Sequence, residues 1–125
     1  MIYLDTHIAV RLYEGDPSDL TPAARNKLGR DDDLRISPFV QLEMEYLHEI
    51  KRLRASATRI VSALEVEIGL RVCDTAFPLV VRQALEEYWT RDPFDRVIVA
   101  QARLHQAALI TLDRHILGHY SHALS

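Results

Sequence analysis

Four short apolar runs, separated by segments of helical character, constrain the fold of this 125-residue chain more than any other feature. Such an alternation is typical of βαβ units, which build a mainly parallel sheet flanked by helices. The expected strands cover residues 2–4, 34–36, 70–73 and 108–111. We therefore predict one α/β domain over residues 1–125, a three-layer sandwich around a mainly parallel sheet of four to five strands.

Capping residues and helix breakers mark the expected helices. Ser, Thr and Asp favour the position before a helix, Pro favours its first position, and Gly favours its end. On these grounds we expect helices over residues 7–14, 22–29, 39–51, 56–67, 78–89 and 93–105, with a short helix after residue 113.

Cysteine content and charge narrow the class of protein. The single cysteine, Cys73, allows no disulfide framework and favours a reducing compartment. No apolar run approaches the ~20 residues of a membrane span, and the first residues lack the apolar core of a signal peptide, so a cytoplasmic location is expected. A net charge of −3 disfavours a simple basic nucleic-acid-binding module. It does not exclude a nuclease, because bound cations dominate the charge of an acidic site.

Acidic residues follow several of the predicted strands. Asp5 comes directly after the strand at residues 2–4, and Asp113 comes just after the strand at 108–111. Ligands of open parallel sheets bind beyond the carboxyl ends of the strands, so both carboxylates are expected at one edge. Each residue is also a candidate helix cap. Asp74 follows the strand at 70–73 in the same way, so strand-end placement alone does not select the functional acids.

The helix predicted over residues 39–51 carries a carboxylate within its apolar face. At 100° per residue, Glu43 falls in the middle of the apolar face, whereas Glu45 and Glu49 lie on the opposite, solvated side. The residues of that face are Val40, Leu42, Met44, Tyr46, Leu47, Ile50 and Leu53. A buried carboxylate is costly unless it is paired, coordinated or protonated. Metal ligation, an arginine partner and a helix rotated toward solvent all remain open for Glu43.

The segment at residues 92–96 has the pattern of a helix start. Asp92 is the expected N-cap, Pro93 takes the first position, and Asp95 lies in the first turn. The helix dipole alone accounts for acids at this place. The following helix is nevertheless apolar on nearly every side, and Asp95 lies on its core side, whereas Arg96 and Arg103 are expected on the wet side.

Four acids therefore have reason to converge: Asp5, Glu43, Asp95 and Asp113. A site made only of oxygen ligands suits Mg²⁺ or Mn²⁺ rather than zinc. His115 and His119 have a zinc-like spacing, but they lie in an expected exposed tail. The sequence contains no glycine-rich phosphate loop and no Gly-x-Ser-x-Gly motif.

These residues lie in segments that resemble PIN-domain toxins of the VapC type, in the order and spacing of that family. The segments are Leu4-Asp5-Thr6-His7, Ser37 to Glu43, Asp92 to Ala102, and Thr111-Leu112-Asp113. The resemblance implies a PIN-like sandwich and a Mg²⁺- or Mn²⁺-dependent endoribonuclease. It further implies catalytic, metal-binding roles for Asp5, Glu43, Asp95 and Asp113, and supporting roles for Thr6, Ser37, Asp92 and Thr111.

Partners are also implied by this resemblance. A cognate antitoxin protein would occlude the active site, the substrate would be RNA, and a homodimer is common in the family. Contact with operator DNA would be made only through the antitoxin, and no membrane association is expected.

Two departures from the family concern regions outside the four acids. Residues 88–91 are Tyr-Trp-Thr-Arg where close relatives often carry histidines, and the chain stops at residue 125 without the longer tryptophan-containing final strand of many relatives. The basic run at residues 51–54, with Arg59, fits either contact with RNA phosphates or antitoxin, or a solvated helix end.

Two other functions are alternatives to the nuclease. One is a non-catalytic PIN-like module that binds protein or RNA, although all four acids are present. Another is a phosphohydrolase or receiver-like domain with Asp5 as nucleophile. That function would need a second acid two residues after Asp5, or a phosphate-binding lysine at a strand end, and position 7 is histidine.

Overall fold

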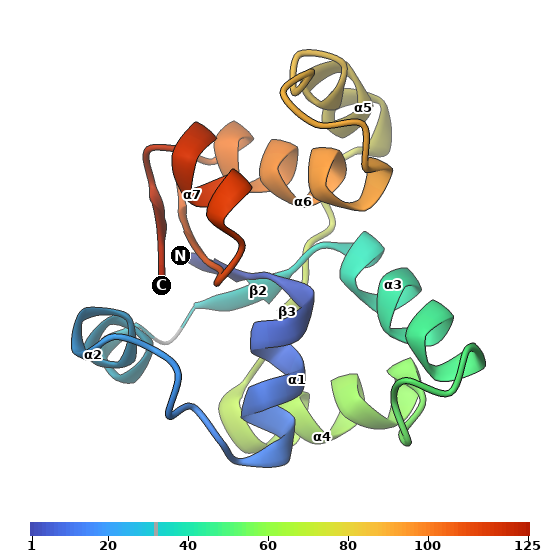
Figure 1. The fold of residues 1–125 in the computed structure, drawn as a ribbon, viewed down its shortest axis with the longest axis vertical. Helices are drawn as coiled ribbons and strands as arrows, with labels where there is room; N and C mark the ends of the chain where they lie inside the picture. Colours follow the sequence, from blue (N-terminus) through green and yellow to red (C-terminus); the bar gives the residue numbers. More distant parts are fainter. Residues whose placement is uncertain (32) are drawn as a thin grey trace.

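The computed structural model describes residues 1–31 and 33–125 and contains a five-stranded, fully parallel sheet in the order β3-β2-β1-β4-β5 (Figure 1). The strands are β1 (Ile2–Leu4), β2 (Leu34–Ile36), β3 (Arg71–Val72), β4 (Ala108–Ile110) and β5 (Ala123–Leu124). The predicted α/β architecture is confirmed. The tail beyond residue 113 supplies the fifth strand, which pairs with β4 in parallel register.

Helices cover both faces of this sheet. They are α1 (Thr6–Glu14), α2 (Pro22–Arg30), α3 (Pro38–Glu49), α4 (Ala57–Ile68), α5 (Phe77–Ala84), α6 (Pro93–Leu104) and α7 (Arg114–His119). Figure 1 shows α5, α6 and α7 on one side of the sheet and α1, α3 and α4 on the other. The result is the expected three-layer sandwich. None of the described helices is both long and apolar enough to cross a membrane.

Several element ends differ from the sequence-based expectation. The helix predicted to reach residue 51 ends at Glu49, because Lys51 takes a left-handed conformation with φ of 65°. The amides of Arg52 and Leu53 then donate to the carbonyl of Leu47, which closes the helix. The helix predicted over 78–89 ends at Ala84, and turns follow it. The predicted strand over 70–73 pairs only at residues 71–72, and the one over 108–111 ends at residue 110.

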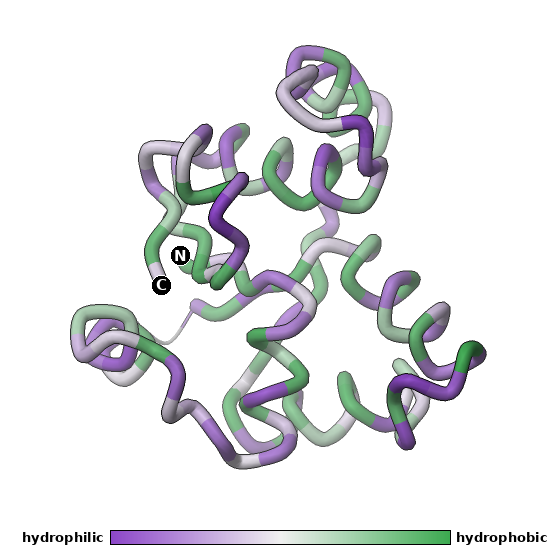
Figure 2. Tube along the Cα trace, in the orientation of Figure 1, coloured by the Kyte–Doolittle hydropathy of each residue, from purple (hydrophilic) through white to green (hydrophobic). Residues whose placement is uncertain are grey.

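The core lies between the sheet and its helices. All three residues of β1 are fully buried, as are Ile36, Leu109 and Ile110 of the neighbouring strands. Figure 2 shows that hydrophobic stretches lie mainly along the strands and inner helix faces, whereas hydrophilic stretches gather in the connecting loops. Strands buried on both faces explain why they appear in the sequence as continuous apolar runs.

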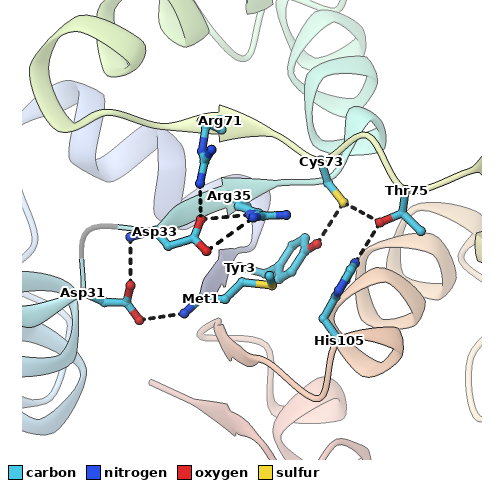
Figure 3. A network of polar contacts seen from close by, with 9 residues as sticks. All are labelled: Met1, Tyr3, Asp31, Asp33, Arg35, Arg71, Cys73, Thr75 and His105. Atoms are coloured by element: carbon cyan, nitrogen blue, oxygen red, sulfur yellow. Dashed lines mark hydrogen bonds and ion pairs between the residues drawn. The ribbon is translucent and has the colours of Figure 1, made fainter.

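A polar network ties together strands β1, β2 and β3 (Figure 3). The buried Tyr3 hydroxyl donates to Sγ of Cys73 at 2.9 Å, and burial raises the pKa of Tyr3. Near the amino ends of β2 and β3, the Asp33 carboxylate accepts from Arg35 and from Arg71, each at 2.9 Å. The Asp33 contacts join β2 to β3 at the edge opposite to Asp5, whereas the Tyr3–Cys73 contact joins β1 to the residue that follows β3.

Candidate active site

The strand order creates a natural binding position at the carboxyl ends of β1 and β4. The chain leaves β1 toward β2 on one side of the sheet, and it reaches β4 from β3 on the other side. The sheet therefore has a topological switch point between β1 and β4, the place where open α/β sheets bind ligands. Asp5 follows β1 and Asp113 follows β4, so both acids border this crevice.

The Asp5 carboxylate is held by one neighbour on each side. Its Oδ1 accepts from the Thr6 amide at 2.8 Å and caps α1, while its Oδ2 accepts from the Thr111 hydroxyl at 2.6 Å. The side chain is 4% exposed. The helix-cap role considered from the sequence is confirmed, and the second oxygen is held by Thr111, the residue that follows β4.

Glu43 reaches the same crevice from α3. Its Oε1 accepts a hydrogen bond from the hydroxyl of Thr6, the residue after Asp5. Desolvation by burial is the main cause of a raised Glu43 pKa; the Thr6 hydrogen bond opposes the rise, and the charges of Asp5 and Asp92 add to it. Within the described residues, no arginine or lysine pairs with Glu43, so the arginine-partner alternative has no support.

Asp95 is the most perturbed acid of the group. Its pKa is raised to about 7, first by burial and then by the charges of Asp92, Asp5, Asp113 and Glu43. All four other acids therefore act on one carboxylate. Asp92 is the N-cap of α6, as predicted, because its Oδ1 accepts from the amides of Phe94 at 2.8 Å and Asp95 at 3.3 Å.

Asp113 and the supporting residues complete the arrangement. Asp113 caps α7 by accepting from the His115 amide at 2.8 Å, and its own amide donates to the Thr111 hydroxyl at 3.0 Å. Thr111 thus connects Asp5 and Asp113 through one hydroxyl. Ser37 is fully buried and caps α3 by accepting from the Phe39 amide at 3.0 Å.

His7 was not singled out from the sequence, yet it lies within this group. The Leu112 amide donates to its Nε2 at 2.9 Å, which leaves the proton of the neutral ring on Nδ1. That Nδ1 is 3.7 Å from Oδ2 of Asp5. A signal was present in the sequence, since His7 follows Asp5 by two residues at the start of α1.

The donor chemistry of this crevice fits a hard divalent cation. The described part of the chain contains no ready cluster of three or more histidine, cysteine or carboxylate ligands. The carboxylates nevertheless act on one another electrostatically. Among the ion pairs of the described residues, only that of His7 with Asp5 involves one of these carboxylates. An all-oxygen set with uncompensated negative charge suits Mg²⁺ or Mn²⁺.

The buried face predicted for α3 was partly wrong. Leu42, Tyr46 and Ile50, assigned to the buried face of α3, are 53%, 51% and 43% exposed. The buried side of α3 is centred instead on Val40 and Met44, because these residues pack against the core; Glu43 therefore lies at its margin rather than its middle.

Two predictions about charged residues also need correction. Glu45, expected on a solvated face, accepts from the Ala57 amide at 3.1 Å at the start of α4. Arg103, expected on the wet side of α6, donates to Glu87 at 2.5 Å, and Glu87 is 2% exposed. Each of these contacts joins two elements that are separate in sequence. The periodicity of a single helix contains no information about such contacts.

Comparison with known proteins identifies similar chains. The family model described as the PIN domain matches residues 2–121. Ribonuclease VapC22 of Mycobacterium tuberculosis is 29% identical over 120 residues, which cover 94% of this chain and 91% of that protein.

Solved structures with the same fold include a toxin–antitoxin complex from Klebsiella pneumoniae, with a TM-score of 0.70 at 18% identity, covering 100% of this chain and 97% of that one. VapC20 of Mycobacterium tuberculosis, a toxin that cleaves the sarcin–ricin loop, has a TM-score of 0.66 at 18% identity, with 100% of both chains covered. At these identities, the structures establish similarity of fold.

Proposed function

The chain belongs to the PIN-domain family, and from that premise we propose that it is a metal-dependent endoribonuclease, the toxin of a toxin–antitoxin pair. Its curated relative is a ribonuclease, and the similar solved structures include toxins and toxin–antitoxin complexes. Asp5, Glu43, Asp95 and Asp113 are the proposed catalytic acids.

One observation carries this proposal: the pKa of Asp95 is raised to about 7 by burial and by four other carboxylates around the switch point. Repulsion among crowded carboxylates opposes folding unless a positive charge offsets it. A bound Mg²⁺ or Mn²⁺ would supply this compensation and activate a water molecule for in-line attack on a phosphodiester.

The residues of this chain have distinct positions in that scheme. The Thr6 amide and the Thr111 hydroxyl hold the two oxygens of Asp5, so the orientation of this carboxylate is set before a ligand arrives. The Thr6 hydroxyl orients Glu43. Burial and the neighbouring carboxylates raise the pKa of Asp95 to about 7, so a cation bound beside it would favour its charged form. No side-chain nucleophile is required.

A protein partner is supported by the toxin–antitoxin complex among the similar solved structures. A cognate antitoxin would block the crevice, and DNA would be contacted only through that antitoxin. A homodimer is supported by apolar side chains that remain exposed on α3 and around α5, namely Leu42, Tyr46, Ile50, Phe77, Leu79, Val81, Leu85 and Tyr88. An RNA substrate and a single buried cysteine agree with a cytoplasmic location.

Cleavage of RNA by purified protein tests the proposal. Wild type is expected to cleave RNA with Mg²⁺ or Mn²⁺ and not with a chelator, and Asp5→Asn and Asp95→Asn are expected to be inactive. Asp74→Asn is the matched control, because Asp74 also follows a strand but is not among the acids that act on Asp95. Binding of RNA without cleavage under any metal condition would favour the non-catalytic module, and equal loss in Asp74→Asn would reject the assignment of these acids.

A further inference from the structure

A cavity of about 430 Å³ lies between α1, the start of α4 and the loop that joins α3 to α4. Three arginines line it: Arg52 and Arg54 from the loop, and Arg59 from the first turn of α4. Tyr13 of α1 lines the same cavity. Figure 2 shows the loop as a mostly hydrophilic segment, and Figure 1 places it beside α4. The basic run in the sequence therefore borders a concave surface.

The backbone that carries these arginines is fixed by local hydrogen bonds. The Arg52 amide donates to the Leu47 carbonyl at 2.8 Å, and the His48 Nδ1 donates to the Leu53 carbonyl at 2.9 Å. Because these contacts hold the loop, less conformational entropy is lost when a ligand binds to its side chains.

The charge of this cavity is mainly uncompensated. Across residues 1–31 and 33–125, no carboxylate lies within ion-pair distance of Arg52, Arg54 or Arg59, and Glu14 is the one acid in the lining. Guanidinium groups stay charged at all physiological pH values and bind phosphate in a bidentate manner. The ligand that fits this cavity is therefore an anionic group with several oxygen acceptors, such as a planar carboxylate or a tetrahedral phosphate.

This cavity, called the arginine cavity below, lies next to a space that is lined by one of the proposed catalytic acids, Glu43. A smaller cavity of about 180 Å³ is lined by Thr6, His7 and Glu43, and it shares Val10 and Leu53 with the arginine cavity. Thr6 and Tyr13 are seven residues apart on α1, which corresponds to about 10 Å at the helical rise. Phosphates of different nucleotides on one strand would therefore lie at the two ends of this segment of α1.

We propose that the arginine cavity binds backbone phosphates of the RNA strand close to the scissile bond. This inference rests on the proposed ribonuclease function. A nucleic-acid strand carries an anion at every nucleotide, so one phosphate would lie at the acids with their cation and another at the arginines. Phosphate contacts of this kind position the strand without reading its sequence.

Binding of a fluorescein-labelled, single-stranded 20-nucleotide RNA of mixed sequence in chelator tests the proposal. Three phosphate contacts on a single strand contribute a slope of about −2 in the logarithm of affinity against the logarithm of salt. The triple variant Arg52→Gln/Arg54→Gln/Arg59→Gln is therefore expected to lose affinity about a hundredfold at 0.1 M salt, together with that slope. In cleavage assays with Mn²⁺ it should raise KM and leave kcat unchanged.

A charge-matched control separates local binding from general electrostatics. Arg25→Gln/Lys27→Gln/Arg30→Gln removes the same charge from α2, where Lys27 and Arg30 line a separate cavity that shares no residue with the arginine cavity. Its affinity should change less than about threefold. The variant Arg52→Lys/Arg54→Lys/Arg59→Lys should bind RNA more tightly than the corresponding Gln triple and less tightly than wild type. Lysine keeps the charge but loses the bidentate geometry of arginine.

The outcomes distinguish this inference from the function on which it rests. Failure of wild type to cleave RNA with either metal rejects the ribonuclease. Cleavage by wild type with equal RNA affinity in the two Gln triples rejects only the phosphate site. Escape of the arginine triple from inhibition by a protein partner, with RNA affinity unchanged, assigns the cavity to that partner and also overturns the proposal. Melting temperatures check the fold, and the single variants Arg54→Gln and Arg59→Gln replace a triple that does not fold.

Discussion

The Thr111 hydroxyl donates to Oδ2 of Asp5 at 2.6 Å, across 106 positions of the sequence. The same hydroxyl accepts the amide of Asp113 at 3.0 Å. One fully buried side chain therefore connects the carboxyl ends of β1 and β4 and holds two of the proposed catalytic acids.

Replacement of Thr111 by valine tests this connection. Valine has the same shape but leaves the Asp113 amide and one oxygen of Asp5 without their partner, which costs about 1–3 kcal/mol in a buried site. We expect that loss in the free energy of unfolding by urea, with a lower kcat for RNA. Thr111→Ser keeps the hydroxyl and is the control. Equal stability of Thr111→Val and wild type would show that the hydroxyl is not structurally important.

The raised pKa of Asp95 predicts a pH dependence of stability in the absence of metal. Its carboxyl titrates at about 7 in the folded protein and at its ordinary value of 3.8 in the unfolded chain. Between these values the folded state holds a proton that the unfolded state has released, so stability falls as pH rises through this window. The raised pKa of Glu43 acts in the same direction.

Urea unfolding in chelator between pH 5 and pH 8 measures this effect. We expect the free energy of unfolding of wild type to decrease toward pH 8, and that of Asp95→Asn to change less. At pH 8 the variant should be at least as stable as wild type. A wild-type profile that rises across this range would contradict the assigned pKa.

Divalent cations should stabilise the folded protein. A ligand that binds only the folded state adds about 2.7 kcal/mol at a hundredfold excess over its Kd. Wild type is therefore expected to melt at a higher temperature with Mn²⁺ or Mg²⁺ than with chelator, and Asp95→Asn should gain little. A wild-type melting temperature that ignores both ions would remove the physical basis of the metal site.

Asp92 and Asp95 should differ in effect although they are close in sequence. Asp92 caps α6 through its side chain, so Asp92→Ala should destabilise by about 1 kcal/mol. Asp92→Asn still caps the helix and should keep stability and some cleavage, whereas Asp95→Asn should be folded and inactive. Complete inactivity of Asp92→Asn in the RNA cleavage assay would place Asp92 in the metal site.

The buried Glu87 should be important for stability rather than for cleavage. It accepts from Arg103 at 2.5 Å and from the Trp89 ring nitrogen at 2.7 Å. Glu87→Ala removes the ion-pair partner of Arg103, whose side chain is 36% exposed, and leaves the Trp89 ring nitrogen without its acceptor. We therefore expect a loss of about 1–3 kcal/mol in the free energy of unfolding. The exposed neighbour offers a control, since Glu86→Gln should change the unfolding free energy by less than about 0.5 kcal/mol.

Local signals in the sequence determined the elements and their order. The N-caps Thr21 and Asp92 and the left-handed Gly15 and Gly69 act on the backbone within one helical turn, so their positions could be read directly. The acids after β1 and β4 could also be placed at one sheet edge, because all strands of a parallel sheet end on the same side.

Packing between distant elements decided what local signals could not. Periodicity showed that α3 has an apolar face, but it did not show which part of that face is covered; Val40 and Met44 are buried, while Leu42 and Tyr46 are exposed. The pairing of Glu87 with Arg103 likewise depends on how α6 meets the turns after α5. Such contacts depend on the positions of neighbouring helices, and no repeat within a single helix contains that information.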